Sequence, residues 1–257
     1  MKTHDLLFEL SHPVRYEILQ LLSEKPLRLT KLGEKVDANN PEVSRHLDRL
    51  KNANLVKKNP DGSYYMTTFG EIMMPLLPTF SIIAAHPDYF LEHDLSLLPH
   101  SFIRRLGELG DCEISRGTPI NLHRMEETAG TCTTRIYTMS NEFVSKVSEN
   151  DPSISNPAVD SEFDFKWVLP ESQLEDTNLM AMADQCGPSQ DDHYRVVPRV
   201  PLFISILDNE VLISFLDEKG RTDFSLCFCS KHPDALKWGM DLFHQIWDSG
   251  QLLSGFR

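Results

Sequence analysis

The chain has 257 residues, of which 40% are hydrophobic and 25% charged, and its formal net charge is −13. This composition is typical of a globular protein and excludes a chain that is disordered throughout. The charge is divided unevenly, because the first 70 residues hold 11 basic and 9 acidic side chains and the remainder holds 14 basic and 29 acidic ones. An acidic surface repels phosphates. We therefore expect two parts with different tasks, of which only the first suits nucleic acid.

The sequence also indicates a cellular location. Residues 1–5 lack the apolar run of a secretory signal peptide, and no segment approaches the ~20 uninterrupted apolar residues of a membrane helix. The five cysteines are an odd number without CxxC pairs, which argues against a disulfide framework or a structural zinc site. We therefore expect a cytoplasmic protein with no membrane partner, no metal site and no cofactor.

Three helices are predicted near the N-terminus. Apolar residues recur every three or four positions in residues 11–22, where Pro13 is tolerated in the first turn. The shorter run 29–36 repeats this pattern. After a break, Asn40 is expected to cap a third helix that has Pro41 in its first turn.

A hairpin and a further helix follow. The β-prone runs 55–58 and 63–67 flank a Pro-Asp-Gly turn at residues 60–62, and an apolar helix begins at Thr68. Two helices, a turn, a third helix, a hairpin and a fourth helix form the order of a winged helix-turn-helix. We assign residues 1–77 to this DNA-binding domain.

The third helix carries the residues that we expect to read DNA. In a helix-turn-helix this helix enters the major groove, where arginine suits guanine and a hydroxyl can donate or accept. Ser44 and Arg45 are therefore the best candidates for base contacts, and Glu42 could accept from cytosine. Arg49 and the start of the second helix would reach the phosphate backbone, as would the hairpin. The predicted DNA-binding residues are Thr30, Lys31, Asn40, Glu42, Ser44, Arg45, Arg49, Lys57, Lys58 and Ser63.

Other interpretations of these residues remain open. Arg45 and Arg49 could be solvated charges on a helix surface. His46 lies beside Leu47, and packing is the favoured interpretation over a base contact. The winged helix could also contact protein in place of DNA.

The motifs of this region resemble a known family. LSHPVRYEIL at residues 10–19, VSRHLDRL at 43–50 and ANLV at 53–56 resemble the ArsR-type winged-helix regulators. The resemblance implies double-stranded DNA as a partner. ArsR-type metal sensors carry paired cysteines on the recognition-side helix, but this sequence has no cysteine before Cys112. Metal sensing at that site is therefore not expected.

The rest of the chain predicts an α/β body, so that the whole is an α+β protein. Residues 78–110 are apolar and proline-rich, and we expect a helical linker or dimerisation segment there. From 111 to 257 we expect an effector-sensing domain. Helix-like stretches at 141–148 and around Leu236 to Trp247, and a loop at 150–157, accompany predicted strands. The strands are expected at 112–115, 133–139, 163–169, 194–197, 202–207, 210–216 and 224–229.

This body is similar to a second family. RVPLFI at residues 199–204, FLDEKGRTD at 215–223 and WGMDLF at 238–243 are similar to the effector domain of archaeal methanogenesis-regulatory (Fil-type) transcription factors. The similarity implies a phospholipase-D-like domain that senses a small molecule and does not catalyse. The active phospholipase D signature HxK(x4)D is absent, because His123, His193 and His232 have no lysine two positions later.

Three residues are candidates for holding the effector. A carboxylate ligand would need a cation in a partly apolar cleft, and Arg135, Trp167 and Arg195 lie on or beside predicted strands. Structural pairing is the alternative for each. Cys227 and Cys229 share one face of a strand, where they could form a redox or soft-metal sensor or simply pack in the core.

The combined prediction is a homodimeric DNA-binding transcription regulator controlled by an unidentified small-molecule effector, and not an enzyme. The alternative is an enzyme with an accessory DNA-binding domain. No nucleophile elbow, phosphate-binding glycine loop or paired catalytic motif supports that alternative.

Overall fold

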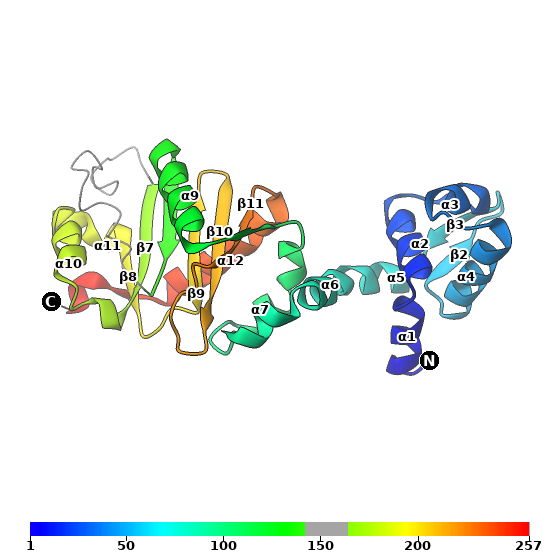
Figure 1. Ribbon diagram of the computed structural model, residues 1–257, viewed down its shortest axis with the longest axis horizontal. Coiled ribbons are helices and arrows are strands. Elements are labelled where there is room, and N and C mark those ends of the chain that lie inside the picture. The colour runs from blue at the N-terminus through cyan, green and yellow to red at the C-terminus, as the bar shows by residue number, and fades with distance from the viewer. Residues whose placement is uncertain (142–163, 257) are drawn as a thin grey trace. The chain divides into compact units, whose positions relative to one another are not determined.

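The computed structural model describes residues 1–141 and 164–256, and the chain divides into two compact units, Met1–Phe80 and Ser81–Arg257. Figure 1 shows both units. The predicted helix at 141–148 lies, apart from Asn141, outside the described residues, as does the predicted loop at 150–157.

The first unit has the winged-helix order. Its three-stranded antiparallel sheet has the strand order β1-β3-β2. The helix α1 precedes the predicted elements and was missed by the sequence analysis. The elements are α1 (Thr3–Leu10), α2 (Pro13–Glu24), β1 (Leu27–Arg28), α3 (Leu29–Lys35), α4 (Asn40–Asn52), β2 (Val56–Lys58), β3 (Ser63–Met66), α5 (Thr68–Met73), the 3-10 helix η1 (Met74–Leu76) and α6 (Leu77–Ala85).

The start of α4 is fixed by a side-chain cap. The Asn39 Oδ1 atom accepts a hydrogen bond from the Glu42 backbone N–H at 3.0 Å, and Pro41 occupies the first turn. The prediction that Asn40 caps this helix is therefore wrong by one residue. Asn39 has the extended backbone that a cap requires, whereas Asn40 is already helical.

The core of the first unit lies where α2, α3 and α4 meet the sheet. Ile18, Leu32, Leu47 and Leu55 are fully buried there. Gly70 in α5 packs directly on the chain that leads into β2: a Cβ atom built on it would lie 2.5 Å from the Leu55 carbonyl oxygen. The domain therefore needs a residue without a side chain at this position.

One helical run is apolar and poorly covered. From Thr68 to Ala85, the 18 residues have a mean hydropathy of 1.4, and 17% of them are buried. By length and composition alone this run could cross a membrane, and it is the one such helix among the described residues.

The second unit is a mixed α/β domain. It consists of α7 (Pro87–Glu92), β4 (His93–Asp94), α8 (His100–Ile103), η2 (Leu106–Leu109), β5 (Glu113–Arg116), α9 (Thr118–Thr131), β6 (Arg135–Met139), β7 (Asp164–Pro170), η5 (Glu171–Gln173), α10 (Thr177–Asp184), η6 (Gly187–Ser189), α11 (Gln190–His193), β8 (Tyr194–Val197), β9 (Leu202–Leu207), β10 (Glu210–Asp217), β11 (Leu226–Ser230), α12 (Pro233–Ser249), β12 (Gln251–Leu252) and η7 (Leu253–Phe256). The strands β8 and β9 coincide with the predicted runs.

Its strands form one sheet with the order β12-β8-β7-β6-β9-β10-β11-β5, and β4 pairs with β10. The neighbours β6, β7 and β8 are parallel, whereas the remaining pairs are antiparallel. The predicted alternation of strands and helices is therefore confirmed in its coarse form as a mixed α/β body.

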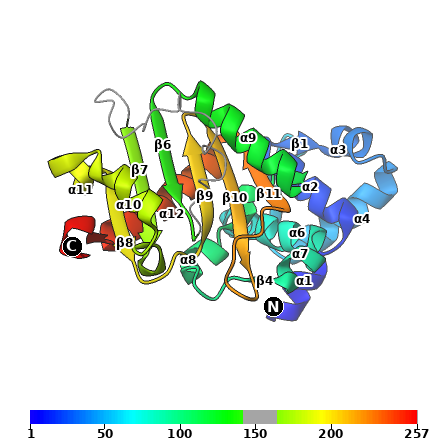
Figure 2. The ribbon, with the colours of Figure 1, turned by 60° about the vertical axis from the view of Figure 1, so that its left-hand side comes forward.

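Helices cover both faces of this sheet (Figures 1 and 2). On one face α12 buries Trp238 and Phe243 against the central strands. On the other face, α9 and α10 cover two smaller apolar clusters. Because successive side chains of a strand point to opposite faces, the register of each strand decides which helix a residue meets.

Residues 81–110 do not form a separate linker. Tyr89, Leu98, Phe102 and Leu106 are buried in the same cluster as α12. The Trp238 indole N–H donates to the Phe102 carbonyl oxygen at 3.3 Å. The segment predicted at 78–110 is therefore largely part of the second unit's core.

Candidate nucleic-acid interface

The exposed side of α4 presents the residues predicted to read bases. Val43, Leu47 and Leu50 are buried in the core, which leaves Ser44 partly exposed and Arg45 exposed. Among the described residues, Arg45 has no ion pair or hydrogen-bond partner. A guanidinium held on a rigid helix with all its donors free suits bidentate contact with guanine or phosphate.

The N-terminal half of α4 also carries Glu42 and His46. The Glu42 carboxylate lies 3.9 Å from the His46 Nε2 atom. The His46 ring packs on the His12 ring of α2, with ring centroids 4.4 Å apart. Burial, followed by the charges of His12 and Arg15, lowers the pKa of His46. The geometry agrees with the packing interpretation of His46, because this ring faces α2.

Arg49 is held within the protein. Its Nε and Nη2 atoms donate to the two carboxylate oxygens of Glu9 in α1, at 2.9 and 2.5 Å. Glu9 also pairs with the buried Arg15 at 3.2 Å, and the hydrogen bond from Arg49 lowers the pKa of Glu9. The Arg49 guanidinium lies over the Phe8 ring, 5.3 Å from its centroid. This residue therefore ties α4 to α1, a role that the sequence analysis did not predict.

The apolar spacing of Leu6, Leu7 and Leu10 could have revealed α1. It does not identify which cation Glu9 would pair with, because the partners come from α2 and α4. The two residues predicted at α3, Thr30 and Lys31, are exposed at its first turn. Lys31 donates to Glu34 at 2.7 Å, a surface pair that water and DNA phosphates can readily replace.

Two lysines of the hairpin are exposed, whereas its serine is buried. Lys57 and Lys58 are exposed on β2, and the Lys58 Nζ atom lies 5.4 Å from the Tyr64 ring centroid. Ser63 is buried: its hydroxyl donates to Asp61 at 2.7 Å and accepts from the Asn59 side chain at 3.0 Å. The predicted contact of Ser63 with DNA is therefore wrong, because the turn uses this hydroxyl.

The three predicted effector-binding residues do not share one cleft. The Arg195 guanidinium lies over Trp247 of α12, 4.5 Å from the ring centroid. Arg135 and Tyr137 are two residues apart on β6, so their side chains point to the same face of the sheet. This is the α12 face, because the Tyr137 ring stacks on Phe243 of α12. Trp167 packs with the α10 cluster on the opposite face. A carboxylate site built from all three residues is therefore excluded by the sheet.

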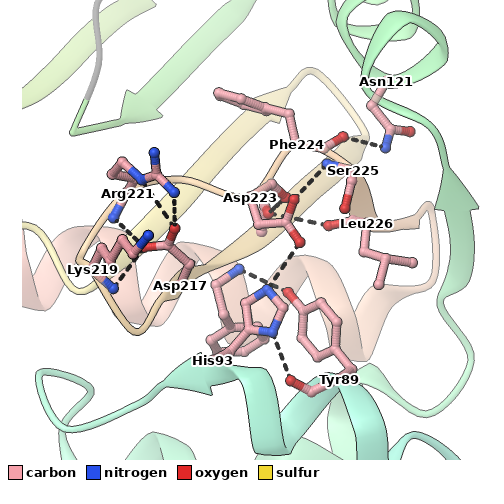
Figure 3. Close-up of polar contacts among 12 residues, drawn as sticks. Tyr89, His93, Asn121, Asp217, Lys219, Arg221, Asp223, Phe224, Ser225 and Leu226 are labelled. Atoms are coloured by element: carbon pink, nitrogen blue, oxygen red, sulfur yellow. Dashed lines mark hydrogen bonds and ion pairs between the residues drawn. The ribbon is translucent and has the colours of Figure 1, made fainter.

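A polar network in the second unit resembles a catalytic pair at first sight (Figure 3). The buried His93 has its Nε2 atom 3.2 Å from the Asp223 carboxylate and its Nδ1 atom 2.6 Å from the Tyr89 carbonyl oxygen. The Tyr89 hydroxyl accepts from the Phe215 N–H at 3.0 Å, and burial raises the pKa of Tyr89.

The His93 side chain is only 2% exposed, with Nδ1 against the Tyr89 carbonyl oxygen and Nε2 beside Asp223, and this burial does not favour a general base that meets a substrate. The nearby Ser214 hydroxyl donates to the backbone carbonyls of Asp223 and Leu226, so it is not presented as a nucleophile. An open cavity of about 360 Å³ adjoins this network. The contacts fasten α7 and β4 to the connection between β10 and β11.

Cys227 and Cys229 are 0% and 2% exposed in the cluster beneath α9. The Cys229 thiol and burial raise the pKa of Cys227 well above its usual value. These features fit core packing. Within residues 1–141 and 164–256, no group of three His, Cys, Asp or Glu side chains is arranged to hold a metal ion.

Comparisons with known proteins give one family match, and it lies in the first unit. No curated protein matches the chain. Among solved structures it is similar to TrmBL2, described as an archaeal chromatin protein that "shows a novel mode of DNA binding", with 13% identity, a TM-score of 0.42, and coverage of 98% of this chain and 100% of that one. Residues 12–58 match the family model described as "Bacterial regulatory protein, arsR family". The ArsR resemblance is thus confirmed for this segment, and residues 12–58 form an ArsR-family helix-turn-helix domain.

Proposed function

We propose that this protein is a transcription regulator that binds double-stranded DNA as a homodimer and responds to a small molecule held by its second unit. The ArsR-family match at residues 12–58 supports DNA binding. The unpartnered guanidinium of Arg45 on the exposed side of α4 is the observation that carries the proposal. In this arrangement α4 enters the major groove, while Lys57 and Lys58 reach phosphates.

In this proposal the second unit binds the effector and does not catalyse a reaction. The burial of the His93 side chain between Tyr89 and Asp223 supports this part of the proposal. A phospholipase-D-like origin and kinship with the Fil-type regulators remain predictions from the motifs of residues 199–243. A cytoplasmic location likewise remains a prediction.

The proposed dimer uses the apolar run that begins at Thr68. Phe69, Ile72, Leu76 and Phe80 follow one another at spacings of three and four residues, and they are 38%, 63%, 47% and 63% exposed. Such a stripe on a helix is typical of a surface that packs against a second helix. A two-fold dimer would present two copies of α4 to major grooves about 34 Å apart along the duplex.

DNA binding can be tested through its salt dependence. The full chain is titrated onto a labelled duplex of random sequence between about 50 and 200 mM salt. We expect the affinity to fall steeply with salt, because each lysine on a phosphate displaces counterions. The Lys57→Ala variant should reduce the slope of log affinity against log salt by about one for each phosphate contact removed.

Lys219→Ala is the matched control, because this exposed lysine belongs to the acidic second unit. It should leave the slope unchanged. An affinity that does not change with salt would reject phosphate contacts by the first unit. That outcome would favour a winged helix that contacts protein.

The dimer is tested by Ile72→Glu. A carboxylate in an apolar interface is costly to desolvate, so we expect light scattering to report half the wild-type mass and operator affinity to fall at least about tenfold. Leu91→Glu is the control, because Leu91 is 76% exposed and lies outside the stripe. Equal masses for wild type and Ile72→Glu would contradict this dimer surface.

A further inference from the structure

A small, partly open cavity lies in the second unit, on the sheet face that α9 covers. Its volume is about 160 Å³. It is separate from the α12 face, where Arg195 packs on Trp247. The residues that line it are Met125 and Ala129 of α9, Ile136, Thr138 and Ser140 at β6, Trp167 of β7, and Phe203, Ser205 and Leu207 of β9.

Two small hydroxyl residues create this space. Thr138 of β6 and Ser205 of β9 are directly opposed in the antiparallel pair, and their hydroxyl oxygens lie 3.4 Å apart. On the same face of β9, Ser205 is flanked by the large side chains of Phe203 and Leu207. Protein interiors are normally filled to crystal-like density. Here a serine that is 5% exposed leaves a gap between large neighbours.

The lining decides which chemistry fits. Among the described residues, the lining contains no Lys, Arg, His, Asp or Glu, so a charged ligand would lose its hydration without a partner. An apolar cavity of about 150 Å³ is known to hold benzene. The Trp167 indole adds an aromatic surface, and rings pack on it favourably. The Thr138 and Ser205 hydroxyls, bonded only weakly to each other, can still donate and accept.

We propose that this cavity binds a neutral molecule with one aromatic ring and a hydroxyl group, that is, a simple phenol. The ring fills the space beneath α9 and the hydroxyl joins the Thr138 and Ser205 pair. This inference rests on the proposed effector role of the second unit. It replaces the expectation of a carboxylate anchored by arginine.

The test uses the full chain and phenol itself as the probe. We expect a dissociation constant on the order of 0.1–1 mM by calorimetry, which is the range for a ligand of this size. Benzoate, which has a similar shape but carries a charge, should bind at least about tenfold more weakly. Benzene, which lacks the hydroxyl, should bind about threefold more weakly or worse.

Two variants place this binding in the cavity. Ser205→Leu fills it from the sheet and Ala129→Leu fills it from α9, and each should weaken phenol binding at least about tenfold. Ala181→Leu is the matched control on an exposed position of α10. Unfolding of Ser205→Leu would leave Ala129→Leu as the deciding variant. No phenol binding, or phenol binding that a folded cavity variant leaves unchanged, would overturn the proposal.

The DNA titration separates this inference from the proposed function. Phenol that binds without altering operator affinity would support the cavity and reject effector control by this ligand. Benzoate that alters operator affinity while phenol does not bind would overturn the cavity proposal and leave effector control standing.

Discussion

Arg45→Ala should weaken binding to an operator selected from random sequences by at least about 30-fold. A bidentate contact between arginine and guanine contributes about 1–3 kcal/mol of discrimination, and a homodimer loses two of them. Binding to duplexes of unrelated sequence should change much less, because it depends on phosphate contacts. Fluorescence anisotropy with both duplexes at one salt concentration measures the difference.

Arg45→Lys is the informative companion. It keeps the charge but replaces the planar fork of donors by a single ammonium group. If Arg45 reads a base, the lysine variant should bind the operator nearly as weakly as the alanine variant. An operator affinity restored to the wild-type value by lysine would show that Arg45 contacts phosphate only.

Gly70→Ala should destabilise the first unit by about 2 kcal/mol or more, even though alanine normally favours a helix. The added Cβ would lie 2.5 Å from both the Leu55 carbonyl oxygen and the Met66 Cγ atom. Leu55 O accepts from the Thr67 N–H at 3.0 Å, so its displacement disturbs the joint between the hairpin and α5. For a domain of this size the melting temperature should fall by roughly 10 °C or more.

The two units can be followed separately in this experiment. All three tryptophans, Trp167, Trp238 and Trp247, lie in the second unit, whereas helical circular dichroism reports both. Gly70→Ala should lower the midpoint temperature of the first unit's unfolding transition, followed by circular dichroism. The midpoint of the transition followed by tryptophan fluorescence should be unchanged. Gly130→Ala, in α9 with open space around its Cβ position, is the control and should not destabilise. A wild-type melting profile for Gly70→Ala would contradict the close packing.

The winged helix could be predicted because its determinants are local. Helical spacing, the proline in the first turn of α4 and the turn at residues 60–62 all lie within a few residues of the structure that they specify. The error at Ser63 has the opposite origin. A serine on a hairpin can donate to a phosphate or close its own turn, and only the positions of Asn59 and Asp61 decide which.

The three residues predicted to bind the effector show that sequence periodicity does not determine which strands are neighbours. Alternation within a strand is readable, but the register between strands is not. Arg135 pairs with Asp164, which places Trp167, three residues later, on the face opposite to Arg135. The cavity beneath α9 was missed for the same reason. Thr138 and Ser205 lie on β6 and β9, far apart in sequence, and only their pairing opposes two small side chains.

The position of β5 at the edge of the large sheet has a consequence for synthesis on the ribosome. Its partner is β11, with Ile114 opposite Phe228. At ~5–20 residues per second, roughly 5–20 s separate the translation of these two strands. The first unit ends at Phe80, and its buried apolar cluster lies between Leu10 and Leu77. All residues of the winged helix are therefore made several seconds before the large sheet can close, so the DNA-binding part can fold ahead of the part proposed to bind the effector.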